Sequence, residues 1–175
     1  MSRSGGRILV DQLALHGADL AFGVPGESYI DVLDALRDSP IRFVTCRHEA
    51  GAANMAEAYG KLTNRPGICL VTRGPGATQA SVGVHTAAQD GTPFLLLVGQ
   101  IPRADAGREA FQELDYRAVC RPAAALVAPG PRVTKQMPGR PVALPTASAI
   151  IEAPPSWRHT VTSIGPPYMP SSAAM

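Results

Sequence analysis

Four short apolar segments, separated by patterns typical of helices, constrain the fold of this chain most strongly. They span residues 20–24, 41–45, 67–72 and 94–98, and every residue of the last is apolar. A segment that is apolar throughout suits a strand covered on both faces, as in a parallel sheet. Strands that alternate with helices predict βαβ units. We therefore expect an α/β fold with a mainly parallel sheet flanked by helices.

The intervening helices are predicted from apolar spacing and from the residues at their ends. Residues 7–16 and 29–37 carry apolar side chains at helical spacing, and Ser28 is available as the N-cap of the second helix. An alanine-rich helix is expected over 48–62, and another over 77–89. These helices account for the segments that connect the strands.

Composition excludes several classes of function. The chain has 175 residues and a net charge of +2, without a Lys/Arg run that would track nucleic acid. Its three cysteines have no CxxC spacing, and no metal-ligand spacing stands out. The longest apolar run is too short to span a membrane, and no signal peptide is recognised. We expect a cytoplasmic protein without nucleic-acid or membrane partners.

Residues 121–175 differ in composition from the rest of the chain. Eleven of the 17 prolines lie there, with Glu152 as the single acidic residue. Such a segment cannot continue helices or central strands easily. We predict a domain over 1–120 and an irregular tail over 121–175. Out-of-frame translation near codon 120 would produce this composition, and a genuine short protein with a disordered tail is the alternative.

Glycine-rich turns at strand ends are the first candidate binding feature. Residues 72–78 read Thr-Arg-Gly-Pro-Gly-Ala-Thr, and residues 23–26 read Gly-Val-Pro-Gly. Turns of this kind place free backbone N–H groups at the carboxyl end of a parallel sheet, where open α/β folds bind ligands. The first turn matches neither a P-loop nor GxGxxG, and ordinary connections also use Gly and Pro.

Glu49 is the candidate catalytic residue. It follows the segment 41–45, in the first turn of the next helix. An acid there is often a surface partner of the helix dipole. An enclosed carboxyl group would instead share a proton with a ligand nitrogen. We expect the strands 41–45 and 67–72 to be neighbours, which would bring Glu49 and residues 74–76 to one edge.

Two further segments carry groups that could orient a small substrate. They are Val98-Gly99-Gln100 and Ala110-Phe111-Gln112-Glu113, although an amide and an aromatic ring also serve as packing and capping groups. His85 lies inside a predicted helix, where a structural role is the simpler interpretation. No Ser-His-Asp arrangement stands out.

Five segments are more specific together than any one alone. In chain order they are Phe22-Gly23-Val24-Pro25-Gly26, Arg47-His48-Glu49-Ala50-Gly51-Ala52, Leu70-Val71-Thr72-Arg73-Gly74-Pro75-Gly76-Ala77-Thr78, Val98-Gly99-Gln100 and Ala110-Phe111-Gln112-Glu113. They resemble the N-terminal domain of acetolactate synthase and its relatives, such as glyoxylate carboligase and benzoylformate decarboxylase, over about residues 6–120. The resemblance implies the thiamine-diphosphate-binding fold and a pyrimidine-binding domain.

The resemblance also implies residue roles. Glu49 matches the glutamate that hydrogen-bonds N1′ of the aminopyrimidine ring and favours the tautomer that deprotonates thiazolium C2. Backbone that lines the pyrimidine pocket is matched by Gly26, Pro75 and Gly76. Positions near the 2-oxo-acid substrate are matched by Phe111 and Gln112, and His85 is a weaker candidate for that region. Thiamine diphosphate is therefore the expected cofactor.

Departures from the family pattern limit what this chain is expected to do alone. Arg73 and Gln79 replace the usual Ser and Asn, and the sequence contains no Gly-Asp-Gly. In the family, a C-terminal domain with that motif holds Mg²⁺ and the diphosphate, and the central domain holds any FAD. The active site forms between two subunits. We expect Mg²⁺ and FAD only through domains absent from this chain, and no activity of the chain alone.

Two functional hypotheses follow. The first is a truncated domain of a 2-oxo-acid carboligase or decarboxylase. The second is a non-catalytic binding or regulatory module that pairs with a full-length relative. A plain nucleotide-binding domain is disfavoured because GxGxxG is missing. Because the family domain buries a large face against its partner, we expect a homodimer or pairing with a full-length relative.

Overall fold

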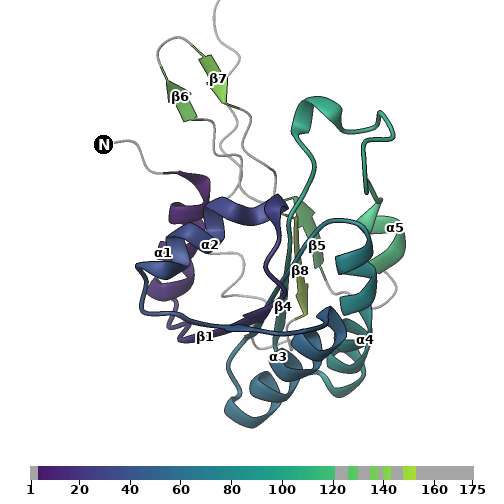
Figure 1. Cartoon of the computed structure of the whole chain (residues 1–175). Coiled ribbons are helices and arrows are strands. Elements are labelled where there is room, and N and C mark those ends of the chain that lie inside the picture. Colours follow the sequence, from purple (N-terminus) through teal and green to yellow (C-terminus); the bar gives the residue numbers. More distant parts are fainter. Residues whose placement is uncertain (1–3, 121–125, 130–134, 138–139, 143–147, 153–175) are drawn as a thin grey trace, which may run out of the picture.

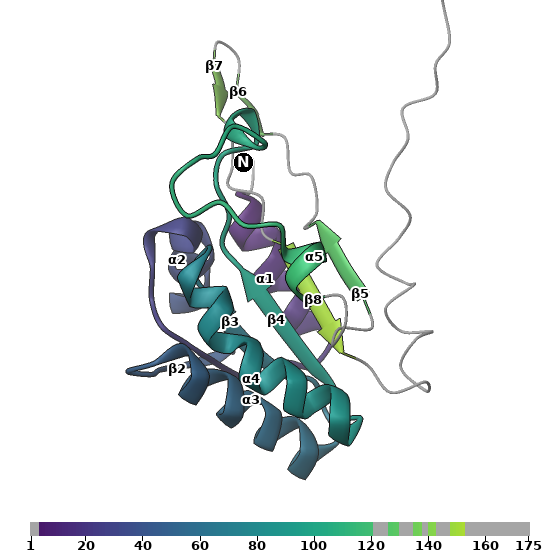
Figure 2. The same ribbon diagram turned by 90° about the vertical axis from the view of Figure 1, so that its right-hand side faces the viewer.

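A central sheet lies between two pairs of helices in the computed structural model (Figures 1 and 2). The structure describes residues 4–120, 126–129, 135–137, 140–142 and 148–152. The large sheet has the order β2-β1-β3-β4-β8-β5. Its first four strands are mutually parallel: β1 (Leu20–Gly23), β2 (Arg42–Thr45), β3 (Gly67–Val71) and β4 (Phe94–Val98). The expected α/β fold with a mainly parallel sheet is confirmed.

The helices cover both faces of this sheet. Figure 1 shows α1 (Gly5–Leu15) and α2 (Ile30–Arg37) on one face and α3 (Glu49–Thr63) and α4 (Pro75–Asp90) on the other. The short helix η1 (Glu27–Tyr29) precedes α2. Two short helices follow β4, and they are η2 (Arg103–Asp105) and α5 (Tyr116–Cys120).

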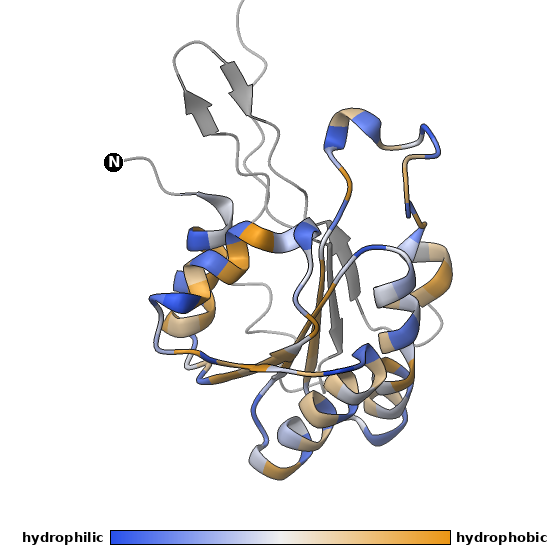
Figure 3. Cartoon of the chain, viewed as in Figure 1, coloured by the Kyte–Doolittle hydropathy of each residue, from blue (hydrophilic) through white to orange (hydrophobic). Residues whose placement is uncertain are grey.

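Each central strand divides its side chains between the two helical layers. Cys69 and Val71 belong to the core beneath α3 and α4, whereas Ile68 and Leu70 belong to the core beneath α1 and α2. All five residues of β3 are buried. Residue hydropathy agrees with this arrangement: the strands are apolar, whereas the helices on either side carry both apolar and polar residues (Figure 3). A strand covered on both faces is apolar throughout for this reason.

Small residues let α3 and α4 approach each other closely. Ala52, Ala53 and Ala56 are fully buried on the inner side of α3. A Cβ atom added to Gly83 of α4 would lie 2.5 Å from the Cβ of Ala53. A larger side chain at either position would separate the helices, so the alanine-rich sequence of α3 sets their spacing.

The predicted elements agree with the structure to within a few residues, and three details were wrong. Ser28 does not cap α2, because it lies inside η1 with its hydroxyl packed against Gly99 and without a hydrogen-bond partner there. Helix α4 begins at Pro75, since proline suits the first helical position. Strands β2 and β3 are not neighbours, because β1 pairs with both.

Four strands in the C-terminal part were not predicted from the sequence. In the large sheet, β8 (Ser148–Glu152) runs antiparallel to β4, and β5 (Leu126–Pro129) runs antiparallel to β8. A separate antiparallel pair consists of β6 (Lys135–Met137) and β7 (Arg140–Val142). The remainder of the predicted tail lies outside the described residues. Its disorder and its out-of-frame origin therefore both stay predictions.

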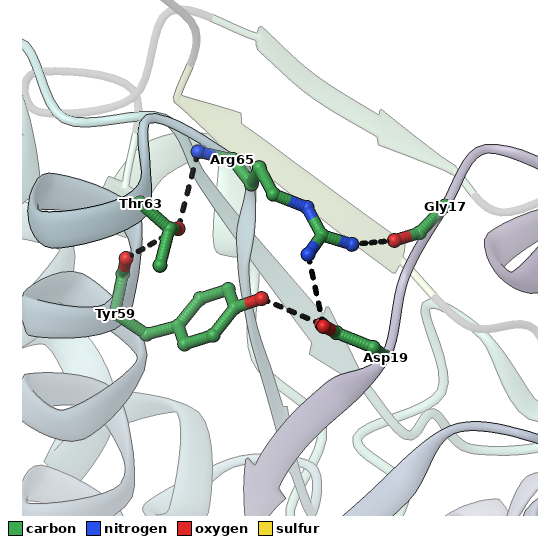
Figure 4. A network of polar contacts seen from close by, with 5 residues as sticks. All are labelled: Gly17, Asp19, Tyr59, Thr63 and Arg65. Carbon is green, nitrogen blue, oxygen red and sulfur yellow. Dashed lines mark hydrogen bonds and ion pairs between the residues drawn. The ribbon is translucent and has the colours of Figure 1, made fainter.

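A polar network joins the end of α3 to the start of β1, at the amino-terminal edge of the sheet (Figure 4). The Tyr59 hydroxyl donates to the Asp19 carboxylate over 2.5 Å, and Arg65 donates to the same carboxylate over 2.9 Å. Arg65 also donates to the carbonyl of Gly17, and Thr63 donates to the carbonyl of Tyr59. The hydrogen bond from Tyr59, with the contribution of Arg65, lowers the pKa of Asp19.

We predict that Asp19→Asn lowers the free energy of unfolding by about 1 kcal/mol at neutral pH. Because the pKa of Asp19 is lowered by folding, its stabilisation is present above the unfolded pKa and is lost as the pH falls through the folded one. The difference between the variant and the parent chain should therefore shrink below about pH 4. Urea denaturation across that pH range measures it. Asp34→Asn, at an exposed carboxylate of α2, is the control and should change little.

Candidate functional site

The turns that follow β1, β2 and β3 meet at the carboxyl edge of the sheet. Glu49 is the first residue of α3, and the ring of His48 caps this helix by accepting from the N–H of Ala50 over 3.1 Å. Gly26 precedes η1, and Gly76 lies in the first turn of α4. The expected meeting of Glu49 with residues 74–76 is thus present, although β1 separates the strands that deliver them.

The backbone of Gly26 and Gly76 forms a cradle beside the Glu49 carboxylate, because neither residue has a side chain to fill the space. A Cβ atom on Gly76 would lie 2.5 Å from the Oγ1 of Thr72 and 3.5 Å from the Oε1 of Glu49. A Cβ atom on Gly26 would overlap the methyl group of Thr72. Glycine at both positions keeps the backbone within reach of a ligand, with Glu49 half-buried beside it.

Tyr29 fixes the turn after β1 against the middle of the sheet. Its hydroxyl donates to the carbonyl of Val24 and lies 3.4 Å from the carbonyl of Leu70. Burial raises the pKa of Tyr29, with smaller electrostatic contributions from Cys69, Glu49 and Cys46. The Tyr29 hydroxyl therefore stays protonated and acts as a structural donor to backbone carbonyls.

Cys69 is the second neutral group close to Glu49. Its thiol lies in β3 and is fully buried. Burial raises the pKa of Cys69, with contributions from Cys46 and Glu49. The phenol of Tyr29 and the thiol of Cys69 therefore both remain neutral, and neither adds charge near Glu49.

Gly74 carries the sharp change of direction between β3 and α4. Its backbone has φ 58° and ψ −110°, which side chains disfavour, and its N–H donates to the Tyr116 hydroxyl over 2.6 Å. A Cβ atom on Gly74 would lie 2.6 Å from the carbonyl oxygen of Gln112. The turn is therefore fitted against the segment that contains Phe111 and Gln112.

The remaining predicted residues occupy different surroundings. Phe111 is 76% exposed, whereas Gln112 is half-buried with a left-handed backbone. Pro75 is exposed at the start of α4, and His85 is exposed nearly three turns further along that helix. Gln100 lies half-buried just beyond β4. The structure therefore groups Gly26, Gly76 and Glu49 closely and leaves Phe111 at the periphery.

Sequence reasoning missed the contacts of Tyr29 and Tyr116 at this edge, and it named Thr72 only as part of the turn over residues 72–78. Each acts through a contact between segments that are distant in the chain, which apolar spacing does not reveal. Arg73 was noted only as a departure from the family pattern. Within the described part of the chain, no three His, Cys, Asp or Glu side chains gather where they could hold a metal ion. None of the described helices is long and apolar enough to cross a membrane.

The sequence matches the family described as "Thiamine pyrophosphate enzyme, N-terminal TPP binding domain" over residues 3–119. The chain belongs to this family. The match ends where the composition of the chain changes, and it covers every element that forms the edge with Glu49. The resemblance inferred from the five sequence segments is thereby confirmed for this TPP binding domain.

Acetolactate synthases are among the relatives of this TPP binding domain. It is 40% identical over 123 residues to the mitochondrial acetolactate synthase catalytic subunit of Aspergillus candidus, covering 70% of this chain and 18% of that protein. It is 42% identical over 118 residues to acetolactate synthase of Bacillus subtilis, covering 67% of this chain and 21% of that protein. The chain thus spans about a fifth of the length of the curated relatives it matches.

We predict that Gly74→Ala destabilises this TPP binding domain by about 3 kcal/mol, since the new Cβ atom meets both a disfavoured backbone conformation and the Gln112 carbonyl. Gly91→Ala is the matched control, because Gly91 also has a positive φ but open space around it. Its cost should be about 1 kcal/mol. Equal midpoints of urea denaturation for the two variants would contradict the close contact at Gly74.

Proposed function

We propose that this chain binds the aminopyrimidine end of thiamine diphosphate at the carboxyl edge of the sheet, with Glu49 as its acid–base partner. The main structural evidence is that the Glu49 carboxylate lies beside the cradle of Gly26 and Gly76. The family match supports the cofactor. This arrangement suits a flat heteroaromatic ring. The ring fits into the space that Gly26 and Gly76 leave free of Cβ atoms, and the carboxyl group of Glu49 can hydrogen-bond a ring nitrogen.

The protein groups at this edge have distinct tasks in the proposal. Glu49 holds or accepts a proton at a ring nitrogen, and Tyr29 and Cys69 stay neutral and add no charge of their own. Backbone at Gly26, Pro75 and Gly76 lines the ring. When bound, thiamine diphosphate supplies the electron sink for chemistry at the carbonyl group of a 2-oxo acid.

The whole-enzyme activity is a further part of the proposal. The relatives named as acetolactate synthases support a carboligase or lyase that acts on a 2-oxo acid, with Phe111 and Gln112 near the substrate. In that scheme a separate domain holds Mg²⁺ and the diphosphate, and FAD, where used, has its own domain. This chain is then a cytoplasmic fragment that is inactive alone. The end of the family match at residue 119 supports an out-of-frame tail.

We predict that the 175-residue chain binds thiamine diphosphate in isothermal titration calorimetry and that Glu49→Gln weakens this binding about tenfold, the cost of one hydrogen bond to a charged group. Glu109→Gln is the matched control at an exposed glutamate of the 106–114 loop, and it should bind as the parent chain does. Loss of affinity in both variants, or in neither, would remove Glu49 from the proposed site.

A pairing module is the second candidate, and an apolar stripe on α3 favours it. Gly51, Met55, Ala58 and Leu62 are exposed at helical spacing along this helix, and Val82 is exposed on α4 beside it. Charged residues usually occupy such positions in a monomer, so the stripe suits a partner. The partner in this proposal is a second copy of the chain or a full-length relative.

We predict that the chain sediments as a dimer or a larger species and that Met55→Lys combined with Leu62→Lys shifts it toward the monomer. Two ammonium groups in a buried interface would be strongly unfavourable without partners. Leu15→Lys is the control, because Leu15 is also exposed but lies on α1 in the other helical layer. A parent chain that is monomeric at all concentrations would rule out self-association through α3.

A further inference from the structure

Arg73 is directed between two loops of the candidate site. It lies two residues after the end of β3 and directly before Gly74, and its side chain is only 14% exposed. One terminal nitrogen of its guanidinium lies 2.7 Å from the Oε1 of Glu27, in the turn after β1. Its Nε donates to the carbonyl of Phe111 over 3.3 Å. A single planar group thus links the β1 turn to the 106–114 loop.

The 106–114 loop is braced from within by a carboxylate. Glu113 accepts from the N–H of Gly107 over 2.6 Å and from the N–H of Ala110 over 3.1 Å. These backbone donors lower the pKa of Glu113. The bonds hold the loop in a compact shape, but they do not attach it to the sheet.

Attachment to the sheet comes from the Arg73–Gly74 pair. Gly74 contacts the backbone of Gln112 and donates to Tyr116, while Arg73 contacts the carbonyl of Phe111. Glu109 and Gln112 both have positive φ, at 54° and 63°. Such conformations are uncommon for residues with a side chain, so the loop needs external contacts to keep this shape.

We propose that Arg73 is a positioning residue for the Phe111–Gln112 segment. Its guanidinium, oriented by Glu27, fixes the Phe111 carbonyl and thereby sets where the Phe111 side chain projects at the edge of the site. This inference rests on the proposed function, in which Phe111 and Gln112 lie near the substrate. It assigns Arg73 no contact with cofactor or substrate.

The geometry explains why arginine is suited to this position. Guanidinium N–H groups point in several directions within one plane, so two acceptors on different loops are reached at once. Serine, the usual residue of the family pattern, is too short to reach either Glu27 or Phe111. Because Glu27 is 76% exposed, solvent screens the ion pair, and its main effect is to orient the guanidinium.

Fluorine NMR of the full chain labelled with 3-fluorophenylalanine tests this inference. The chain has four phenylalanines, and Phe111 is exposed whereas Phe22 and Phe94 are buried. Phe111→Leu assigns the resonance of Phe111. We expect Arg73→Ser to move this resonance toward that of the free amino acid and to leave the other three in place. Arg73→Lys, which keeps the charge, should restore part of the shift.

Two further variants make the test decisive. Arg37→Ser is the matched control, because Arg37 forms surface ion pairs on α2 and should leave all four resonances unchanged. Glu27→Gln removes the carboxylate that orients Arg73. Because Glu27 is exposed, this variant should fold, and it tests the inference if Arg73→Ser does not fold. In Glu27→Gln, the Phe111 resonance should move part of the way toward that of the free amino acid. An unchanged Phe111 resonance in both folded variants, or in Glu27→Gln alone when Arg73→Ser is unfolded, overturns the inference.

Titration of the same labelled chains with thiamine diphosphate separates the two proposals. If the Phe111 resonance depends on Arg73 but thiamine diphosphate does not bind, the proposed function fails while Arg73 still positions the loop. If thiamine diphosphate binds but the resonance is independent of Arg73, the positioning inference fails and the cofactor site stands.

Discussion

The close approach of α3 to α4 and to the sheet is the constraint on which the candidate site depends. It is possible because alanine and glycine occupy the inner sides of these helices. Gly67 at the start of β3 lies directly against the backbone of Ala56, where no side chain would fit. Packing at this distance fixes both helix beginnings relative to the strand ends, with little freedom for adjustment.

This packing gives the edge its electrostatic character. Glu49 stands at the beginning of α3, where backbone N–H groups and the helix dipole favour a negative charge. Tyr29 and Cys69, whose pKa values Glu49 helps to raise, remain neutral. The charged Arg73 at the same edge is paired with Glu27. In the proposed function, the ring nitrogen of the ligand meets the Glu49 carboxyl group, while Arg73 is engaged with Glu27.

Sequence reasoning found those features that follow from chain direction alone. Glu49, Gly26 and Gly76 each lie within a few residues of the carboxyl end of a parallel strand, so their shared edge was predictable without knowing the strand order. The order itself was not predictable, since no local pattern says that β1 separates β2 from β3. Ser28 was assigned as a cap from its residue type, but burial against Gly99 decided its environment. The reach of Arg73 to Glu27 and Phe111 depends on side-chain direction, which spacing does not contain.

The antiparallel strand β8 changes the position of β4 in the sheet. It pairs with β4 along its whole length, from Phe94 opposite Glu152 to Val98 opposite Ser148. Without that partner, five consecutive apolar residues would form a free sheet border with unpaired N–H and C=O groups, which is a template for amyloid-like stacking of chains. Whatever the origin of the residues after 120, β8 covers this apolar strand edge, so that β4 is not open to pairing with other copies of the chain.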